Sequence, residues 1–479
     1  MKIQADFPEK AYFVDTFGFN VYAIGGYVRD LFLKREPDEI DLLITGQTVD
    51  SIVSRLEGKG KVDLVGKSFG VIKFTVRGRT YDIALPRKDR PRSADVRGHK
   101  DFIIDADPDL PLEKDLERRD FRCNSLALRL SDSTVIDPLK GQDDIRDKTI
   151  RLTNPDAFPD DPLRVLRAAR FASVLDFSVD PSIYPIAKEV DLKGLSVERV
   201  SEELFRILLR SEQPSRGLDE LFKLGALRQL FPELYELALS IQDSVFHPET
   251  DDFGHNTVWA HTLITVDQAG RLARNFKLTR EAALALLLAA LYHDTGKPET
   301  AGWEFKRGRM AITNNGHDLA SERVASAAFD RMKIFSWNGY PIRKVVLSLV
   351  RTHHRASELW AGRDRITKKA FNRLAADVNG EIDLAIYLDA ADRAGRDTAP
   401  IEGLDEEARW LQHKFSEWNV SKNTIKPLVL GRDLIQMNVT PGPYMGKVLD
   451  RLFQMQLDNE FDTRENGLKA AERLLREDK

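Results

Sequence analysis

The feature that most constrains the fold is a change in hydrophobic pattern near residue 155. Before it, short β-like runs such as NVYAIGG and IDLLITG alternate with helical pieces. After it, PLRVLRAARFASVL and VERVSEELFRILLR repeat apolar residues every three or four positions, which is typical of amphipathic helices. We therefore expect an α+β chain, in which a mixed β-sheet domain with helices is followed by all-α domains.

The length of 479 residues suggests three or four domains. Two polar stretches that contain proline, 241–255 and 396–403, are suited to linkers. The predicted domains are 1–150, 151–240, 241–400 and 401–479.

Composition narrows the class of protein. The net charge of −4, from 72 basic and 76 acidic residues, means that any nucleic-acid site must be a local patch. A single cysteine, Cys123, excludes a disulfide framework and a cysteine-based zinc site. The longest apolar run, residues 282–292, is too short to span a bilayer, and the N-terminus has no apolar signal core. We expect a soluble cytoplasmic protein with no membrane partner.

A glycine pair ends the first β-like run. Gly25 and Gly26 are followed by a predicted helix over 27–34. A glycine turn at a helix N-terminus lets backbone N–H groups approach a phosphate, and Arg29 would add a bidentate contact. The alternative is an ordinary glycine turn.

Two closely spaced acids follow this turn. If residues 40–44 form a strand, Glu39 and Asp41 point to the same face. Neighbouring carboxylates repel unless a cation lies between them, and Mg²⁺ prefers such oxygen ligands together with substrate phosphates. Asp82, on another strand-like run, is a candidate third carboxylate. The alternative is a solvated acidic strand end.

These motifs resemble the nucleotidyltransferase core of the tRNA nucleotidyltransferases and bacterial poly(A) polymerases, in the bacterial–eukaryotic class. GGYVRD followed by acid-x-Asp carries the first part of the resemblance. It continues, in order and spacing, through DLERRDFRCNSLAL (115–128), VIDPLKGQDDI (135–145), FPDDPLRVLRAARFAS (158–173) and VERVSEELFRIL (197–208). The chain departs from the family at Glu39, where the family has aspartate.

The resemblance implies a reaction. The tRNA 3′-hydroxyl would attack the α-phosphate of CTP or ATP and release pyrophosphate, with Glu39, Asp41 and Asp82 holding Mg²⁺. Arg119 and Asp120 match residues on the sugar and triphosphate side. Related enzymes add only CC, only A, or poly(A), and the core motifs barely separate these alternatives.

The helix over 158–173 would select the base. Asp161 only accepts hydrogen bonds and Arg164 only donates them. Cytosine and adenine offer the complementary donor and acceptor, whereas guanine and uracil present the wrong polarity. The resemblance assigns this selection to Asp161 and Arg164, with Arg167 and Arg170 also near the nucleotide. The alternative is a helix cap for the aspartate and an ion-paired face for the arginines.

Histidines and aspartates gather in the third segment. His293 and Asp294 close the buried apolar helix, and adjacent buried polar groups cost free energy unless they are paired or bind a metal. With His261 and Asp392, they resemble the metal ligands of the HD phosphohydrolase superfamily, and imidazole with carboxylate suits a divalent transition metal. The resemblance implies phosphatase or 2′,3′-cyclic phosphodiesterase activity. An alternative of another class is an HD phosphohydrolase whose nucleotidyltransferase domain only binds RNA.

Three further histidines, His317, His353 and His354, either line the substrate phosphate or are structural. RNA contact is expected in two other places. The basic stretch 86–100 would position the RNA end or the nucleotide, unless it is a solvated loop, and the tail over 428–460 would hold RNA through phosphates. The candidate RNA-binding residues of the basic stretch are Arg87, Lys88, Arg90 and Arg92.

Overall fold

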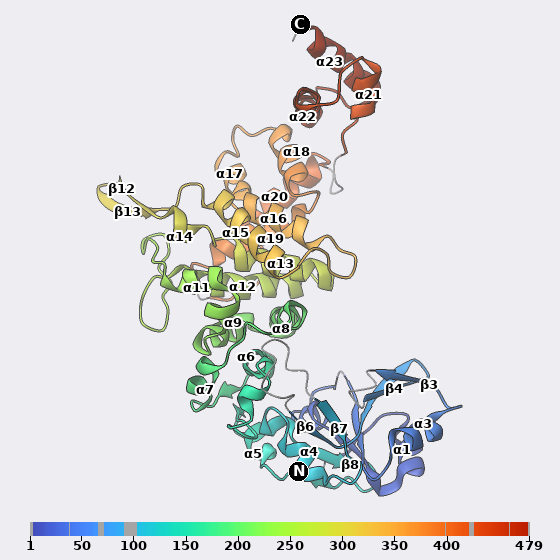
Figure 1. The fold of residues 1–479 in the computed structure, drawn as a ribbon. Coiled ribbons are helices and arrows are strands. Elements are labelled where there is room, and N and C mark those ends of the chain that lie inside the picture. Colours follow the sequence, from blue (N-terminus) through green and yellow to red (C-terminus); the bar gives the residue numbers. More distant parts are fainter. Residues whose placement is uncertain are drawn as a thin grey trace. The chain divides into compact units, whose positions relative to one another are not determined.

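The computed structural model describes residues 3–37, 39–65, 71–90, 103–397, 399–420, 426–458 and 460–477. The chain divides into two compact units (Figure 1). The first comprises residues 1–211 and 216–230, and the second comprises residues 212–215 and 231–479. The finer division into four domains stays a prediction.

A seven-stranded mixed sheet forms the centre of the first unit, in the order β3-β4-β5-β2-β1-β8-β9. The apolar runs of the sequence become its inner strands, and β1 is buried along its whole length. Only β2 and β5 pair in parallel among the described strands of this sheet. The strands of this unit are β1 Val21–Ile24, β2 Asp41–Ile44, β3 Lys61–Val65, β4 Val71–Val76, β5 Arg79–Ala84, β6 Arg87–Arg90, β7 Ile103–Ala106, β8 Ala127–Arg129, β9 Val135–Ile136, β10 Thr149–Ile150 and β11 Ser178–Val179.

Helices surround this sheet and then continue the chain. The apolar stripe of α6 packs on α8, as the three- and four-residue spacing predicted. The helices up to residue 230 are α1 Lys10–Phe17, α2 Gly26–Phe32, α3 Val49–Leu56, α4 Leu112–Glu117, α5 Gly141–Arg146, α6 Leu163–Leu175, α7 Ile183–Glu189, α8 Val197–Arg210, α9 Pro214–Lys223 and α10 Ala226–Leu230, with 3₁₀ turns η1 Gly18–Asn20, η2 Arg122–Asn124 and η3 Phe158–Asp160.

The second unit is mainly helical and is built around α13, the apolar run of the sequence, which is buried from Leu284 to Tyr292. Thr257 and Thr279 cap α12 and α13 by accepting backbone N–H groups. Its helices are α11 Pro232–Leu239, α12 Val258–Asn275, α13 Arg280–Tyr292, α14 Lys297–Thr300, α15 His317–Arg331, α16 Ile342–Thr352, α17 Arg355–Ala361, α18 Lys368–Asp377, α19 Ile382–Ala394, α20 Glu406–Glu417, α21 Gly431–Gln436, α22 Pro443–Leu457 and α23 Arg464–Glu477.

One β-hairpin interrupts this helical region, and the expectation of continuous helix there is wrong. Strands β12 Gly302–Lys306 and β13 Arg309–Thr313 pair in antiparallel register. The two residues between them, Arg307 and Gly308, both have positive φ, which is the geometry of a tight hairpin turn. The turn contains only one glycine, so the signal in the sequence is weak.

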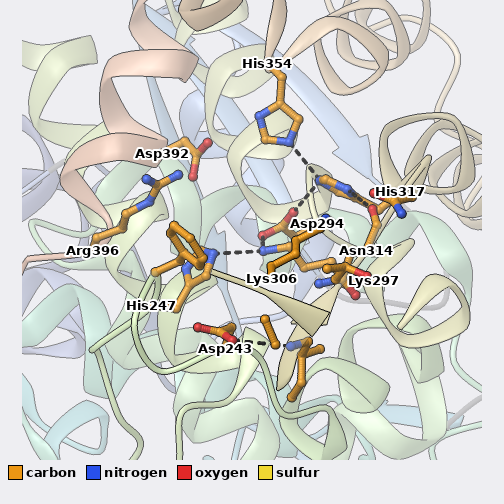
Figure 2. A pocket seen from close by; sticks show the side chains of 15 residues that line it. Asp243, His247, Asp294, Lys297, Lys306, Asn314, His317, His354, Asp392 and Arg396 are labelled. Atoms are coloured by element: carbon orange, nitrogen blue, oxygen red, sulfur yellow. Dashed lines mark hydrogen bonds and ion pairs between the residues drawn. The ribbon is translucent and has the colours of Figure 1, made fainter. Parts of the chain in front are cut away.

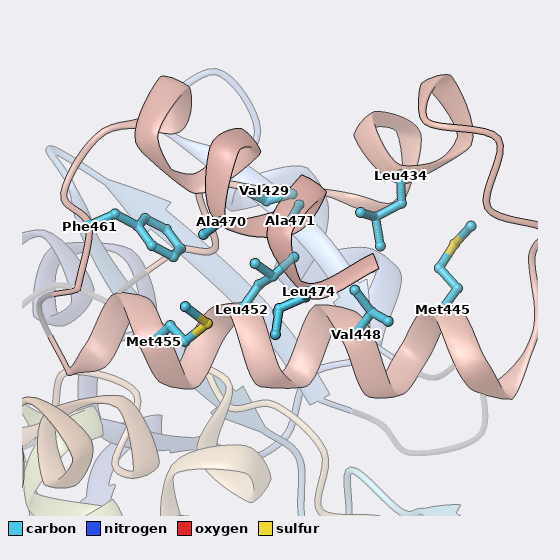
Figure 3. Close-up of a cluster of buried hydrophobic side chains, with 10 residues drawn as sticks. All are labelled: Val429, Leu434, Met445, Val448, Leu452, Met455, Phe461, Ala470, Ala471 and Leu474. Carbon is cyan, nitrogen blue, oxygen red and sulfur yellow. The ribbon is translucent and has the colours of Figure 1, made fainter. Parts of the chain in front are cut away.

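The tail has a small hydrophobic core of its own (Figure 3). Side chains from α21, α22 and α23 form it, including Leu434, Leu452 and Ala471. Asn372 of α18 donates to the carbonyl of Leu457 at 3.0 Å, which ties the tail to the preceding helices. The helical tail that the sequence predicted is therefore confirmed. Within the described part of the chain, no helix has the length and apolar character needed to cross a bilayer.

Candidate active sites

The turn that ends β1 requires glycine at Gly25. Its φ of +66° lies in the left-handed region, and an added Cβ would stand 3.0 Å from Arg119 Nη1. The Gly25 N–H donates to the carbonyl of Leu126 at 3.0 Å. Gly26 begins α2, where it lies beside the Arg29 side chain. The glycine turn therefore lies directly against Arg119, one of the predicted nucleotide-binding residues.

Asp41 and Asp82 are neighbours because β2 and β5 pair in parallel with these two residues as Cα partners. Glu39 is exposed and precedes β2, which begins at Asp41. The strand predicted over 40–44 thus starts one residue later, and the shared face of Glu39 and Asp41 stays a prediction. The Glu39 and Asp82 charges both act on the Asp41 carboxyl.

The electrostatics of this carboxylate group favour a cation. Burial raises the pKa of the Asp41 carboxyl to about 6, Arg119 and Lys73 oppose the rise, and the charges of Glu39 and Asp82 add to it. Lys73 Nζ lies 3.2 Å from Asp82 Oδ1. The donors are all carboxylate oxygens, which are the ligands Mg²⁺ prefers, so the residues fit such an ion.

A hydrogen-bonded network joins the turn to α6. Arg29 is buried, where it donates to Asp30 through Nε at 2.9 Å and to Asn124 through Nη1 at 2.6 Å. Asn124 in turn donates to Asp120, whose other oxygen lies 2.5 Å from Arg167 Nη2. Burial alone would raise the pKa of Asp120, but the Arg167 charge and these hydrogen bonds hold it below its ordinary value. Arg29, Asp120 and Arg167 are therefore brought together as one linked group.

The predicted base-selecting pair lies at the start of α6, which begins at Leu163 within the predicted 158–173 segment, after the 3₁₀ turn Phe158–Asp160. Asp161 Oδ1 accepts the Leu163 N–H at 3.2 Å, in the manner of a helix cap. Arg164 donates to the main-chain carbonyls of Ala157 and Arg118, at 2.6 and 2.9 Å. The guanidinium is thus oriented by backbone, and base selection by the pair stays a prediction.

Arg170 is the most enclosed arginine of the predicted stripe. Its Nε lies 2.5 Å from Glu203 Oε2 of α8, and its guanidinium covers the Phe171 ring at 4.0 Å. Burial lowers its pKa to about 10, against the opposing charge of Glu203. In this structure Arg170 joins α6 to α8, as its ion-paired alternative describes, and a nucleotide contact by Arg170 stays a prediction.

The basic stretch is not a simple loop. Its first part, Arg87–Arg90, forms strand β6, which pairs with β7, so the alternative of a solvated loop is wrong for these four residues. The Arg87 N–H donates to Asp115 at 3.4 Å. Lys88 and Arg90 lie on the same strand, and Arg92 lies outside the described residues.

The predicted HD ligands meet in the interior of the second unit. His261 comes from α12, His293 and Asp294 follow α13, and Asp392 comes from α19. His261 Nε2 lies 2.9 Å from Asp392 Oδ1, and His293 Nε2 lies 3.1 Å from Asp294 Oδ2. His261, His293 and Asp392 place one ligand atom each within 4.8 Å of one another. All four residues are buried.

A second histidine group adjoins the first. His317, His353 and His354 also place ligand atoms within 4.8 Å of one another. Asp294 lies between the groups, because its Oδ1 is 3.4 Å from His317 Nε2 (Figure 2). His353 Nε2 is buried with no hydrogen-bond partner among the described residues, and His293 Nε2 lies 3.1 Å from the Asp294 carboxylate. A buried ring nitrogen without a partner, next to another beside a carboxylate, fits a divalent transition metal.

Charge coupling in this centre is strong. Burial would raise the pKa of Asp294, but His293 and Lys297 hold it well below its ordinary value. Burial would lower the pKa of His261, but hydrogen bonds to Asp392 and Glu249 raise it to about 9. These are the shifts expected where carboxylates lie beside imidazoles, because each charged form stabilises the opposite charge of its neighbour.

Sequence reasoning missed two members of this centre. Glu249 Oε1 lies 3.0 Å from His261 Nδ1 and 2.9 Å from His247 Nδ1, which makes a further group of possible ligands. Lys297 Nζ lies 2.7 Å from Asp294 Oδ2. The signals were present as the HPE triplet at 247–249 and as a lysine three residues after Asp294.

A cavity of about 370 Å³ opens onto this centre. The ligand side chains Asp294, His317, His354 and Asp392 line it, together with Arg396. Lys306 of the β12–β13 hairpin also lines it (Figure 2). The cavity is large enough for a nucleotide-sized group beside the ligands.

Comparison with known families supports both parts of this architecture. A family model described as the poly A polymerase head domain matches residues 21–151. One described as a probable RNA and SrmB-binding site of polymerase A matches 176–237, and an HD domain model matches 258–397. The fold and the sites thus define a nucleotidyltransferase head joined to an HD domain.

Relatives and solved structures agree. The chain is 33% identical over 350 residues to a multifunctional CCA protein of Dechloromonas aromatica, covering 71% of this chain and 76% of the relative. It is 37% identical over 297 residues to one of Stenotrophomonas maltophilia, covering 60% and 67%. The Bacillus stearothermophilus CCA-adding enzyme in complex with CTP shares the fold, with a TM-score of 0.59 at 21% identity over 98% of both chains.

The chain belongs to the tRNA nucleotidyltransferase and poly(A) polymerase family of the bacterial–eukaryotic class, among members that carry an HD domain, and it is an enzyme of that class. The resemblance identified from GGYVRD, RRDF and the histidine pattern is confirmed, as is the α+β fold class. The metal-binding expectation is confirmed in its coarser form, since groups of possible ligands are present.

Proposed function

We propose that this chain adds C and A to the 3′ end of tRNA without a template, using CTP and ATP and releasing pyrophosphate. The observation that carries the proposal is the meeting of three elements at Arg119. Its Nη1 lies against the Gly25 turn, and its charge acts on Asp41, which pairs across the sheet with Asp82. We place the reaction in the cytoplasm, where these substrates are found.

Glu39, Asp41 and Asp82 would hold Mg²⁺ at this site. The ion, when bound, supplies positive charge at the triphosphate and the attacking hydroxyl. Arg119, beside the glycine turn, binds the phosphates and keeps the developing charge of the leaving pyrophosphate in place. The Asp120–Arg167 pair fixes this side of the site to α6.

Base selection rests on the polarity of Asp161 and Arg164. Two main-chain carbonyls orient the Arg164 guanidinium and leave further N–H groups for a base. A site that donates at one position and accepts at the other rejects a base of inverted polarity, because buried polar groups would be left unpaired. C and A are thereby accepted and G and U rejected.

The HD centre carries a second candidate activity, hydrolysis of phosphate esters with a divalent transition metal. The buried ring nitrogens favour it, because His353 Nε2 has no hydrogen-bond partner among the described residues and His293 Nε2 lies 3.1 Å from Asp294 Oδ2. A metal there supplies Lewis acidity and an activated water. The residues around it orient the substrate, with Lys297 and Arg396 offering positive charge along the cavity wall.

The first experiment measures incorporation of each of the four labelled nucleotides into tRNAs that end before CCA, after C and after CC. Addition of C, C and then A, followed by a stop, is the expected result. Incorporation of only C, of only A, or of long A tracts would move the chain to a CC-adding, A-adding or poly(A) enzyme.

The matched control is the Asp41→Ala variant, which should lose incorporation and keep hydrolysis. No incorporation by the unaltered chain on any tRNA, with Mg²⁺ present, would overturn the polymerase proposal and leave an HD phosphohydrolase with an RNA-binding head. RNA would be held near the head by the basic strand that includes Arg87, Lys88 and Arg90, and elsewhere by the tail, through phosphate contacts that weaken with salt.

A further inference from the structure

We infer that the β12–β13 hairpin is a binding arm for single-stranded RNA, and that it delivers an RNA 3′ end to the HD cavity. The inference deepens the proposed HD activity and rests on it for the chemistry of the cavity. In Figure 1 the hairpin projects from the helices of the second unit. Its sequence, GWEFKRGRMAIT, interleaves aromatic and basic residues, which is a composition suited to nucleic acid.

The two faces of the hairpin differ in role. Antiparallel pairing sets Trp303 opposite Ile312 and Phe305 opposite Met310, so these side chains share one face. Trp303 is 68% exposed and Phe305 is 72% exposed. Neither aromatic residue lines the HD cavity, whereas Lys306, Ala311 and Thr313 from the opposite face do, as does Ile312 from the aromatic face. The hairpin therefore contributes to the cavity wall and leaves the rings of Trp303 and Phe305 open to solvent.

The tip of the hairpin carries two arginines, Arg307 and Arg309, that contact residues lining the cavity. The guanidinium groups of Arg307 and Arg309 each lie 6.0 Å from the ring of Phe246. Phe246 lines the cavity and is 47% exposed. Asp243 holds Arg309 by two contacts of 2.7 Å, so the tip is fixed beside the cavity, which Asp243 and Phe246 both line. An aromatic ring with two guanidinium groups near it thus stands at the cavity wall.

Charge decides between an RNA strand and other occupants. Residues 303–310 carry one acid, Glu304, and three bases, Lys306, Arg307 and Arg309, for a net charge of +2. Lys306 pairs with Glu304 at 2.8 Å, but both are exposed, and such a surface pair yields readily to phosphate. Stacking on Trp303 and Phe305 accepts every base, and the tip charges complement a phosphate backbone. An apolar protein partner would offer no counter-charge to the exposed Arg307 at the tip.

The test compares two substrates of the HD centre, cytidine 2′,3′-cyclic phosphate and a hexamer RNA that ends in the same group. The Trp303→Ala/Phe305→Ala double variant should raise the KM for the hexamer roughly tenfold. It should leave the KM for the mononucleotide unchanged. The exposed Phe335→Ala variant is the matched control and should change neither. Both aromatic positions are exposed, so the fold should tolerate their loss.

A second pair of variants tests the tip. Arg307→Glu should weaken binding of the hexamer and make that binding less dependent on salt concentration. Arg365→Glu, at an exposed site outside the hairpin, should change neither property. Crosslinking of a hexamer carrying 4-thiouridine, mapped by mass spectrometry, should label residues 303–310, and this readout does not require hydrolysis.

The outcomes separate the two proposals. Crosslinks at the hairpin without hydrolysis of either substrate would overturn the HD activity and keep the RNA arm. Equal KM changes for both substrates, or crosslinks that avoid the hairpin, would overturn the arm. A double variant that binds RNA normally but loses self-association would reassign the aromatic face to contact between copies of this chain.

Discussion

The HD centre and the nucleotidyltransferase head differ in how completely the folded chain assembles their ligands. In the HD centre, His261, His293 and Asp392 already place ligand atoms within 4.8 Å of one another, deep in a helical core. In the head, Asp41 and Asp82 share a strand pairing, but Lys73 contacts Asp82 and Glu39 stays exposed. Among the described residues, every group of three ligands at that spacing lies in the second unit.

The difference teaches that the two centres are stabilised by different means. Helix packing holds the HD ligands together at the cost of burying charge, which a metal would offset. The head leaves Glu39 exposed and Asp41 and Asp82 half-buried, and it fixes the surrounding arginines instead, through Asp120–Arg167 and Arg170–Glu203. We expect its metal to arrive with the nucleotide, since Mg²⁺ is commonly held by carboxylates and substrate phosphates together.

The largest expected effect is a reciprocal loss of activity. Asp41→Asn should lower nucleotide incorporation roughly 10³-fold, because a neutral amide holds Mg²⁺ poorly, and should leave hydrolysis unchanged. Asp392→Asn should do the reverse. Labelled CTP incorporation and hydrolysis of a cyclic phosphate, assayed on the same preparations, check both. If either variant abolishes both activities while remaining folded, the two centres are not independent.

The next effect tests how much the buried Arg170–Glu203 pair contributes to the stability of the head. Glu203→Ala leaves the buried Arg170 cation without its partner and should destabilise the protein by about 3–5 kcal/mol. The neighbouring Glu202→Ala is the control, because Glu202 pairs with Arg206 on the surface and should cost less than about 1 kcal/mol. Urea unfolding measures both. Equal costs would show that Arg170 does not depend on Glu203.

The sequence predicted the features that depend on neighbouring residues, and it missed contacts between residues far apart in the chain. The glycine turn and the pair His293 and Asp294 follow local patterns, namely a strand end and the end of a buried apolar helix. His261 and Asp392 were added by the family resemblance, and the structure brings them beside that pair. Glu249 was missed because its contact with His261 joins a linker to α12, and no periodicity connects them.

The hydrogen-bond and ion-pair partners of Arg164 and Arg170 were not predicted, because they too lie far away in the sequence. Arg164 donates to Arg118, and Arg170 to Glu203 thirty-three residues away, so both contacts depend on tertiary packing. The β12–β13 hairpin was missed because two five-residue strands joined by a turn with a single glycine look much like the ends of helices.

A smaller effect concerns pH. The Asp41 pKa is raised to about 6, so this carboxyl is already protonated at pH 5, where an ordinary aspartate is ionised. At limiting Mg²⁺, incorporation should therefore fall about tenfold for each pH unit below 6, because only the ionised form binds the cation. Saturating Mg²⁺ should move the fall to lower pH. Incorporation that falls only near pH 4, whatever the Mg²⁺ concentration, would contradict a raised Asp41 pKa.

The smallest effect is expected at Glu39, the position where the chain departs from its family. Glu39 precedes β2 and is exposed, so its longer side chain has room to reach a cation that Asp41 and Asp82 hold. Glu39→Asp should change the Mg²⁺ concentration for half-maximal incorporation by less than about fivefold, or about 1 kcal/mol. Glu39→Gln is the control that removes the charge and should cost more. A gain of two orders of magnitude from Glu39→Asp would instead mean that the natural head is a weakened polymerase, and the difference between the two centres would then be one of activity as well as assembly.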